Sequence, residues 1–291
     1  MCHQTQSEKI RYAFSSAVVV LLAATLVSTA YAQEEASTAE GAAGQQAAGA
    51  TDLAKKTQNP VSDLISVPFE NNFQWGAGFE DEFSYLLVIK PVYPMKLSEE
   101  WNLVHRVLAP VSYFPEPAPG IDDAFGLGDI TYQAFFSPES TEPFVWGVGP
   151  QFQFPTATDD ILGTDKWSVG PAAVALQLNG PWVYGALLTY MYSFAGDDAR
   201  DDVRLGALQY FINYNLPSGW YLTTSPTNTL NFEADDDKWT IPLGGGAGKV
   251  VKFGPLPVNL SLQAYYNVER PPGAPEGTVR FQFSFLLPRG R

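Results

Sequence analysis

Residues 258–269 read VNLSLQAYYNVE, and this stretch decides the fold class. Apolar and polar side chains alternate along it: one set comprises Val258, Leu260, Leu262, Ala264, Tyr266 and Val268, and the other comprises Asn259, Ser261, Gln263, Tyr265, Asn267 and Glu269. Because successive side chains of a β-strand point to opposite faces, the alternation predicts a strand with one apolar and one polar face.

The same alternation recurs along the chain and predicts about twelve strands. They cover approximately residues 67–77, 83–96, 101–114, 126–136, 144–154, 166–178, 182–195, 203–216, 220–232, 239–253, 258–269 and 278–288. Proline is the main objection, because it has no N–H to donate to the strand ladder. The interior prolines are Pro91, Pro110, Pro150, Pro171, Pro226 and Pro242. β-Bulges could accommodate some of them, and counts of ten or fourteen strands stay open.

The connections between these strands alternate between two kinds. Tight turns rich in Gly, Pro, Asn and Ser lie at residues 97–100, 137–143, 179–181, 216–219 and 254–257. Longer, acid-rich loops lie at residues 78–82, 115–125, 156–165, 196–202, 233–238 and 269–277. A bacterial outer-membrane barrel has short periplasmic turns and longer outer loops. The pattern therefore predicts an all-β, antiparallel up-and-down transmembrane barrel whose two ends both lie in the periplasm.

A soluble β-sandwich also has alternating strands, so the surroundings of the apolar face need separate evidence. Three observations favour lipid: an export signal, strands of about 10 or more residues, and tryptophans near strand ends, where aromatic girdles meet lipid headgroups. These tryptophans are Trp75, Trp101, Trp167, Trp182, Trp220 and Trp239. We therefore expect a barrel in the outer membrane of a Gram-negative bacterium, in preference to a secreted sandwich or lipocalin-like barrel.

The N-terminus has the features of a secretory signal peptide. Lys9 and Arg11 precede an apolar run over residues 13–27, and the AYA triplet at residues 30–32 supplies small residues at the cleavage positions. The run is too short for a spanning helix, which needs roughly 20 consecutive apolar residues. We expect residues 1–32 to be a cleaved signal peptide.

Two further regions are expected after the cleavage site. Residues 33–60 form a flexible periplasmic tail, since their first part contains no large apolar side chain that could offset the entropy of ordering. A short helical or irregular piece broken at Pro60 ends this tail. Residues 61–291 form the barrel. Whether residues 52–66 plug the barrel is left open by the sequence.

Charge and cysteine content limit the partners. The chain carries 17 basic and 31 acidic side chains, and removing residues 1–32 takes away two of the basic and one of the acidic groups. The mature chain thus keeps 15 basic and 30 acidic groups. Phosphate binding needs a basic face, so we expect no nucleic-acid partner. The single cysteine, Cys2, would be removed with the signal, so no internal disulfide is expected.

Side chains that face the lumen of a barrel select what passes through it. Strand parity places there a mostly neutral, amide-rich set: Lys90, Arg106, Asp129, Gln133, Gln151, Gln153, Gln209, Asn213, Gln263, Tyr265, Asn267, Arg280 and Gln282. Glu70, Asn72, Gln74, Thr131 and Asn259 share this parity. Lys90 and Arg106 lie on neighbouring strands and could form a basic spot. Alternatively, these side chains fill the lumen by hydrogen bonding and leave little or no pore.

His105 and the acidic loops could suggest a catalytic site and a metal site, but a structural role and a solvated surface are favoured. His105 is the only histidine after the signal, and with a serine it could serve a membrane-embedded hydrolase. Its parity turns it toward lipid, and Ser112 has the opposite parity, so a structural role is favoured. The acidic loops offer oxygen ligands but lack the spacing of a calcium loop. We expect a solvated, negative outer surface with no metal and no cofactor.

Several long segments carry a family resemblance. They include NPVSDLISVPFENNFQWG, GLGDI, WGVGPQFQFPTATDDILGTDKWSVGPAAVAL, GPWVYGAL, NYNLPSGWYLTTSP, WTIPLGGGAGKVVKFGPLPVNLSLQAYYNV and FQFSFLLP. On these motifs the chain resembles the bacterial family labelled MetA-pathway of phenol degradation, over about residues 52–288. The resemblance implies an outer-membrane barrel or transporter and an association with the degradation of aromatic compounds. It carries no catalytic residues with it.

The favoured function is a passive channel or uptake protein for small solutes, with aromatic or apolar compounds suggested by the resemblance alone. A closed structural or adhesive barrel without a pore is the alternative, and a lipid hydrolase using His105 is the third hypothesis. We expect no enzymatic activity. Expected partners are outer-membrane lipid, lipopolysaccharide, a small-molecule solute, and the barrel assembly machinery, which would bind the aromatic-rich final strand.

Overall fold

The computed structural model of the chain describes residues 40–139, 142–254 and 256–287. The expected signal peptide and the first part of the expected tail lie outside these residues. The described chain begins with the helix α2 (Glu40–Thr57) and continues into strands.

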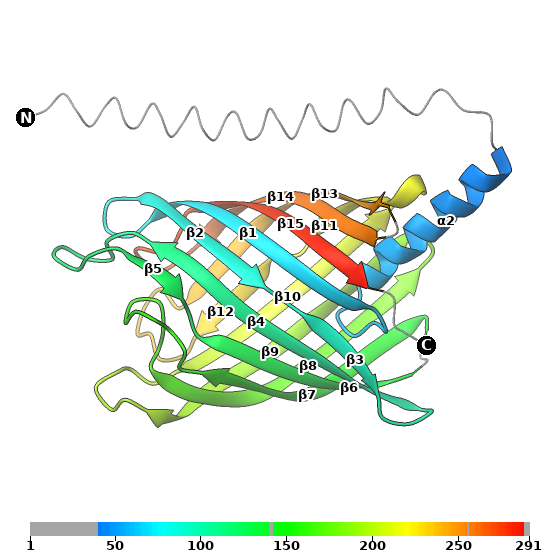
Figure 1. Cartoon of the computed structure of the whole chain (residues 1–291). Helices are drawn as coiled ribbons and strands as arrows, with labels where there is room; N and C mark the ends of the chain where they lie inside the picture. Colours follow the sequence, from blue (N-terminus) through cyan, green and yellow to red (C-terminus); the bar gives the residue numbers. More distant parts are fainter. Residues whose placement is uncertain (1–39, 140–141, 255, 288–291) are drawn as a thin grey trace, which may run out of the picture. The chain divides into compact units, whose positions relative to one another are not determined.

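One antiparallel sheet closes on itself to form a barrel (Figure 1). Its segments are β1 (Ile65–Ala77), β2 (Glu82–Ile89), β3 (Val92–Lys96), β4 (Trp101–Phe114), β5 (Ala124–Leu127), β6 (Ile130–Pro138), β7 (Phe144–Phe154), β8 (Lys166–Asn179), β9 (Trp182–Gly196), β10 (Arg204–Asn215), β11 (Trp220–Thr224), β12 (Thr227–Asn231), β13 (Trp239–Phe253), β14 (Leu256–Glu269) and β15 (Gly277–Leu287). A short helical turn, η1 (Pro217–Gly219), joins β10 to β11. Because β1 pairs with β15 and β9 pairs with β10, the ring of described strands is complete.

The fifteen segments form twelve spans, because three spans are each interrupted once: β2 with β3, β5 with β6, and β11 with β12. Two interruptions coincide with prolines. Pro91 separates β2 from β3 and Pro226 separates β11 from β12, since proline has no N–H to donate to a neighbouring strand. The predicted twelve-stranded, all-β antiparallel barrel is therefore confirmed.

The other prolines are accommodated within continuous strands. Pro150 of β7 and Pro171 of β8 lie directly opposite each other. The ladders on their far sides, β6 with β7 and β8 with β9, each skip positions at this level. Pro242 lies at a register shift between β13 and β14. At these three prolines the missing donor thus coincides with a local break in pairing, and the strand itself continues.

The two faces of a strand differ sharply, as β9 illustrates. Leu188 is 57% exposed and Phe194 is 60% exposed, whereas Val183 and Leu187 are buried inside the barrel. The exposed face continues on other strands as large apolar side chains, among them Phe73, Phe152, Leu208, Leu222, Tyr266 and Phe281. Soluble proteins rarely expose such a wide apolar surface, and a closed barrel satisfies its backbone polar groups internally, as a bilayer requires. The exterior of the barrel is therefore suited to lipid.

Within the described residues, no helix combines the length and the apolar character needed to cross a membrane.

The interior has an apolar wall that the sequence did not predict. Its buried side chains come chiefly from the strands β4 and β6 to β10, with Val61 contributed from the segment before β1: Val61, Val104, Phe135, Val145, Ala172, Val174, Leu176, Val183, Leu187 and Phe211. Strands β8 and β9 are apolar on both faces, so a search of the inner parity for polar residues could not find this wall. The buried inner side chains of β8 and β9 in this wall are apolar, whereas β6, β7 and β10 contribute both apolar and amide side chains.

The helix α2 occupies much of the expected tail. Residues 33–60 were expected to form a flexible tail that ends in a short helical or irregular piece, and residues 40–57 are helical. The sequence of this segment, EGAAGQQAAGATDLAKKT, is rich in alanine, which has the highest helix propensity, and contains several other good helix formers. The absence of large apolar side chains therefore does not prevent a helix here.

A second buried cluster ties this N-terminal segment to the point where the barrel closes. Ala54 of α2 and Leu64, just before β1, pack with Tyr221, Val250 and Leu286. Leu286 belongs to the last strand, which pairs with the first. This cluster, called here the seam cluster, therefore joins the segment before the barrel to β11, β13 and the last strand, β15.

A charge on the outer face tests whether this face meets lipid. For Leu188→Arg, midway along β9, we expect the free energy of unfolding to fall by about 2–4 kcal/mol, the cost of a basic side chain at the bilayer midplane. Urea titration of the protein folded into lipid vesicles, followed by tryptophan fluorescence, measures this change. Asp198→Arg in the loop after β9 is the control and should have little effect. Equal stability of the two variants would contradict a lipid-facing β9.

Candidate functional site

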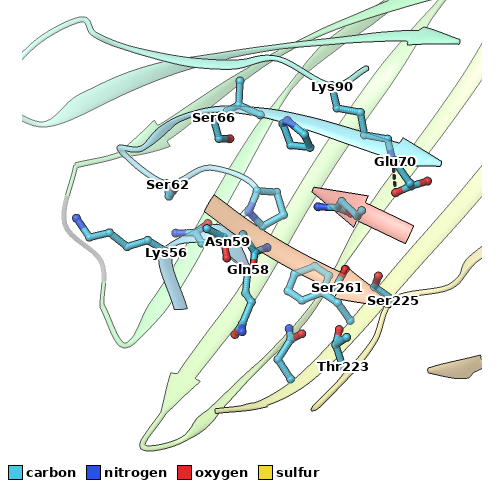
Figure 2. Close-up of a pocket in the computed structure, with 18 of the residues that line it drawn as sticks. Lys56, Gln58, Asn59, Ser62, Ser66, Glu70, Lys90, Thr223, Ser225 and Ser261 are labelled. Atoms are coloured by element: carbon cyan, nitrogen blue, oxygen red, sulfur yellow. Dashed lines mark hydrogen bonds and ion pairs between the residues drawn. The ribbon is translucent and has the colours of Figure 1, made fainter. Parts of the chain in front are cut away.

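A polar cavity of about 160 Å³ lies inside the barrel (Figure 2). Strands β1, β3, β4, β10, β11, β14 and β15 contribute side chains to its wall. Its floor is formed by residues 56–60 and Ser62, which comprise the end of α2 and part of the connection to β1. Strand residues near the start of β1, β11 and β14 line the cavity, so it occupies the half of the lumen where the chain enters the barrel.

The floor segment is held by a small number of specific contacts. Gln58 and Asn215 exchange two amide hydrogen bonds, of 2.9 and 3.0 Å. The hydroxyl of Thr51 donates to the carbonyl of Leu216 at 3.3 Å. Val61 is buried in the apolar wall. The sequence left open whether residues 52–66 plug the barrel, and the structure shows that part of this range lines the cavity.

A buried ionic network lies in the cavity wall. Lys90 Nζ donates to Glu70 Oε2 at 2.7 Å, as Figure 2 shows, and Arg280 Nε lies 3.4 Å from Glu70 Oε1. Arg280 Nε also donates to Asn72 Oδ1 at 3.0 Å, and its guanidinium carbon lies 5.0 Å from the centre of the Tyr265 ring. One carboxylate is thus shared by two cations.

Arg106 adds a third cation without a matching anion. Its side chain lines the same cavity as Glu70 and Lys90. The Nε and Nη1 atoms of Arg106 are buried and have no hydrogen-bond partner in the described part of the chain. Its guanidinium carbon lies 5.9 Å from the centre of the Phe135 ring, in the apolar wall. Arg106 therefore stands where the charged and apolar sides of the lumen meet.

The structure distributes the predicted lumen residues among three places. Those that line the cavity are Lys90, Arg106, Gln209, Asn213, Gln263 and Gln282. Those buried in the wall around it are Gln133, Gln151, Tyr265 and Arg280, of which Arg280 has a side chain 15% exposed. The remaining three, Asp129, Gln153 and Asn267, lie toward the opposite end of the barrel and bind loops.

Asp129 shows what this third group does. Its carboxylate accepts hydrogen bonds from the backbone N–H groups of Thr156, Ala157 and Thr164 and from the side chain of Gln153. Asn267 similarly donates to the carbonyl of Pro275, in the loop before β15. Parity alone does not separate these loop anchors from cavity residues, because both kinds share the inner face of a strand.

Sequence reasoning missed several residues that line the cavity. These are the floor residues, Phe211 of the apolar wall, and Tyr221, Thr223 and Ser225 around the break between β11 and β12. The proline after Ser225 was the available signal, since it marks a break in the strand. The floor had no comparable signal in its composition.

His105 lies in an aromatic setting outside the cavity. Its Nδ1 is 2.7 Å from the hydroxyl of Tyr132, and its ring lies 6.4 Å from the ring of Tyr93, which is exposed. Ser112 instead donates to the backbone carbonyl of Tyr85. The structure therefore pairs His105 with a phenol. Among the described residues, no group of three or more His, Cys, Asp and Glu could hold a metal ion.

Removing the shared carboxylate tests the ionic network. With Glu70→Gln, Lys90 and Arg280 lose their anion, and we expect the free energy of unfolding in vesicles to fall by about 3–5 kcal/mol, the usual cost of an uncompensated buried charge. The control is Glu139→Gln, which breaks an exposed pair with Lys96 at 3.8 Å and should cost less than about 1 kcal/mol. Urea titration compares the two variants, and equal losses would show that the network is not effectively buried.

Comparison with known proteins agrees with the barrel and identifies the family. Residues 69–284 match the family described as "Putative MetA-pathway of phenol degradation". An outer membrane channel from Pseudomonas putida F1 has a similar structure, with 16% identity, a TM-score of 0.58 and coverage of 77% of this chain and 93% of that chain. This likeness shows the fold alone.

Two other solved structures are less similar. The translocator domain of the autotransporter NalP from Neisseria meningitidis has 12% identity, a TM-score of 0.44 and coverage of 84% of this chain and 94% of its own. The monoaromatic hydrocarbon channel CymD has 9% identity, a TM-score of 0.43 and coverage of 86% and 93%. No curated protein matches this sequence.

The family match covers most of the chain and coincides with the barrel strands. The closed antiparallel barrel and its apolar exterior are those of a Gram-negative outer-membrane protein. The chain therefore belongs to the family described as the MetA-pathway of phenol degradation, and it is an outer-membrane β-barrel.

Proposed function

We propose that the protein is a passive outer-membrane channel or uptake protein for small solutes, including single-ring aromatic or apolar compounds. The observation that carries this proposal is the cavity inside the closed barrel, which combines a polar wall with an adjoining apolar one. Ligand sites in proteins are typically apolar concavities with a few placed polar groups. A solute would diffuse down its gradient and exchange water for these side chains.

The floor segment is the obstacle that such a solute meets. Its polar attachment is the amide pair between Gln58 and Asn215, and the neighbouring Val61 packs in the apolar wall. The preceding helix is attached by the bond from Thr51 to Leu216. A net hydrogen bond typically contributes only about 0.5–1.5 kcal/mol. A local shift of this segment therefore costs far less than unfolding the barrel, and it would connect the cavity to the periplasm.

The orientation and partners are part of the proposal. The short turns would lie in the periplasm with α2, and the longer acidic loops would face outward toward lipopolysaccharide, as in other bacterial barrels. The final strand β15, with Val279, Phe281 and Phe283 along one parity, would be the segment read by the barrel assembly machinery. The aromatic character of the solute is supported by the family description and by the rings near the cavity.

A closed barrel without a pore is the second candidate. It is favoured by the small volume of the cavity and by the floor residues that line it. The two candidates differ in whether the floor moves.

Displacing the floor distinguishes them. In planar bilayers we expect the protein to give small single-channel currents, and Val61→Asp to raise the mean current severalfold because a buried carboxylate would drive the floor out of the apolar wall. The control is Asp63→Asn in the same segment, whose side chain is 57% exposed. Liposome swelling with neutral, anionic and aromatic solutes is the parallel measurement. Folded protein that passes neither current nor solute, with or without Val61→Asp, would refute the channel.

A further inference from the structure

The cavity holds more positive than negative charge. Glu70 is the one carboxylate among its lining residues, and it is already shared by Lys90 and Arg280. Arg106 lines the same cavity, and two of its nitrogens are buried without a hydrogen-bond partner in the described chain. A guanidinium stays charged at any physiological pH, and a buried charge without a partner is unfavourable. An anion in the cavity would remove this cost.

The surroundings of Arg106 also specify the rest of the ligand. The guanidinium lies by the ring of Phe135, which belongs to the apolar wall. Phe211 is a member of the same wall and lines the cavity directly, and Val92 both lines the cavity and packs against the wall. A ligand whose anionic end meets Arg106 would thus place its other end on apolar surface.

From this arrangement we propose that the cavity binds a small amphipathic carboxylate, whose carboxylate pairs with Arg106 and whose hydrocarbon part lies on the apolar wall. The inference deepens the proposed channel function, on which it rests, by naming the class of solute. The planar guanidinium matches the geometry of a carboxylate, which it can meet with two parallel hydrogen bonds along one edge.

The volume of the cavity agrees with this class. It measures about 160 Å³, and an engineered cavity of about 150 Å³ in another protein holds benzene. A single-ring carboxylate such as benzoate is therefore of suitable size. A cation of the same shape would meet Lys90 and Arg106 without a free anion, which selects against it.

The acidic outer loops act in the opposite sense, since they would repel an anion at the mouth. Exposed charges are screened over about 8 Å at physiological ionic strength, whereas buried groups are screened much less. The selectivity of the lumen and that of the mouth should therefore respond differently to salt, and the preference for anions should increase as salt is raised.

The test compares benzoate with benzyl alcohol, a neutral ligand of similar shape, on the full-length barrel. In detergent, calorimetry should show benzoate binding at least about tenfold more tightly than benzyl alcohol, and Arg106→Gln should abolish that difference, in line with the strength of charged hydrogen bonds. Arg106→Lys keeps the positive charge but loses the two parallel N–H donors of the guanidinium, so this variant should bind benzoate with intermediate affinity. The control Arg204→Gln removes a cation whose side chain is 59% exposed and should leave binding unchanged.

Reversal potentials in a potassium chloride gradient supply a second readout. The protein should prefer chloride to potassium, and Arg106→Gln should lose that preference. A channel that passes solutes but binds benzoate no better than benzyl alcohol would overturn the carboxylate site and leave the channel standing. Benzoate binding that depends on Arg106 in a barrel without current would support the site and refute the channel. Even if Arg106→Gln does not fold, the affinities of the unaltered protein for benzoate and benzyl alcohol test the carboxylate site.

Discussion

The structure depends on one constraint: in a bilayer each backbone N–H and C=O must find a partner within the protein. The pairing of β1 with β15 meets this constraint by closing the sheet, and every other feature follows from closure. A closed sheet has an inside and an outside, so the alternation of side chains becomes a division between lipid and lumen. The prolines illustrate the same requirement, because Pro150 and Pro171 lie opposite each other at a level where the neighbouring ladders are already broken.

The sequence predicted the sheet well because a period of two is a local property. The stretch from Val258 to Glu269 shows this, since Gln263 and Tyr265 are buried while Tyr266 and Val268 are exposed. The breaks in the strands were also visible as prolines. What the sequence could not show is which inner residues meet across the lumen. Glu70 and Arg280 lie far apart in the chain, and they come together only because the first and last strands are neighbours.

Two other features of the site also lay beyond sequence reasoning. The apolar wall is built from strands whose two faces are both apolar, so parity carries no information about which face is inside. The floor comes from a segment whose composition resembles a solvated tail, and its position is set by tertiary contacts such as the pair formed by Gln58 and Asn215. In both cases long-range packing decides the outcome. Parity therefore pointed to some of the polar residues that line the cavity, such as Gln209 and Gln263, and not to the floor or the apolar wall.

The seam cluster has a consequence for how the lumen can change. Ala54 and Leu64 flank the floor segment on either side and are both fixed in that cluster, together with Leu286 of the last strand. The floor is therefore a short tether anchored at its two ends. Withdrawing the whole N-terminal segment would expose the apolar side chains of Tyr221, Val250 and Leu286, which burial strongly opposes. Any rearrangement that leaves the barrel intact must therefore be a flexing of the few residues between those two anchors.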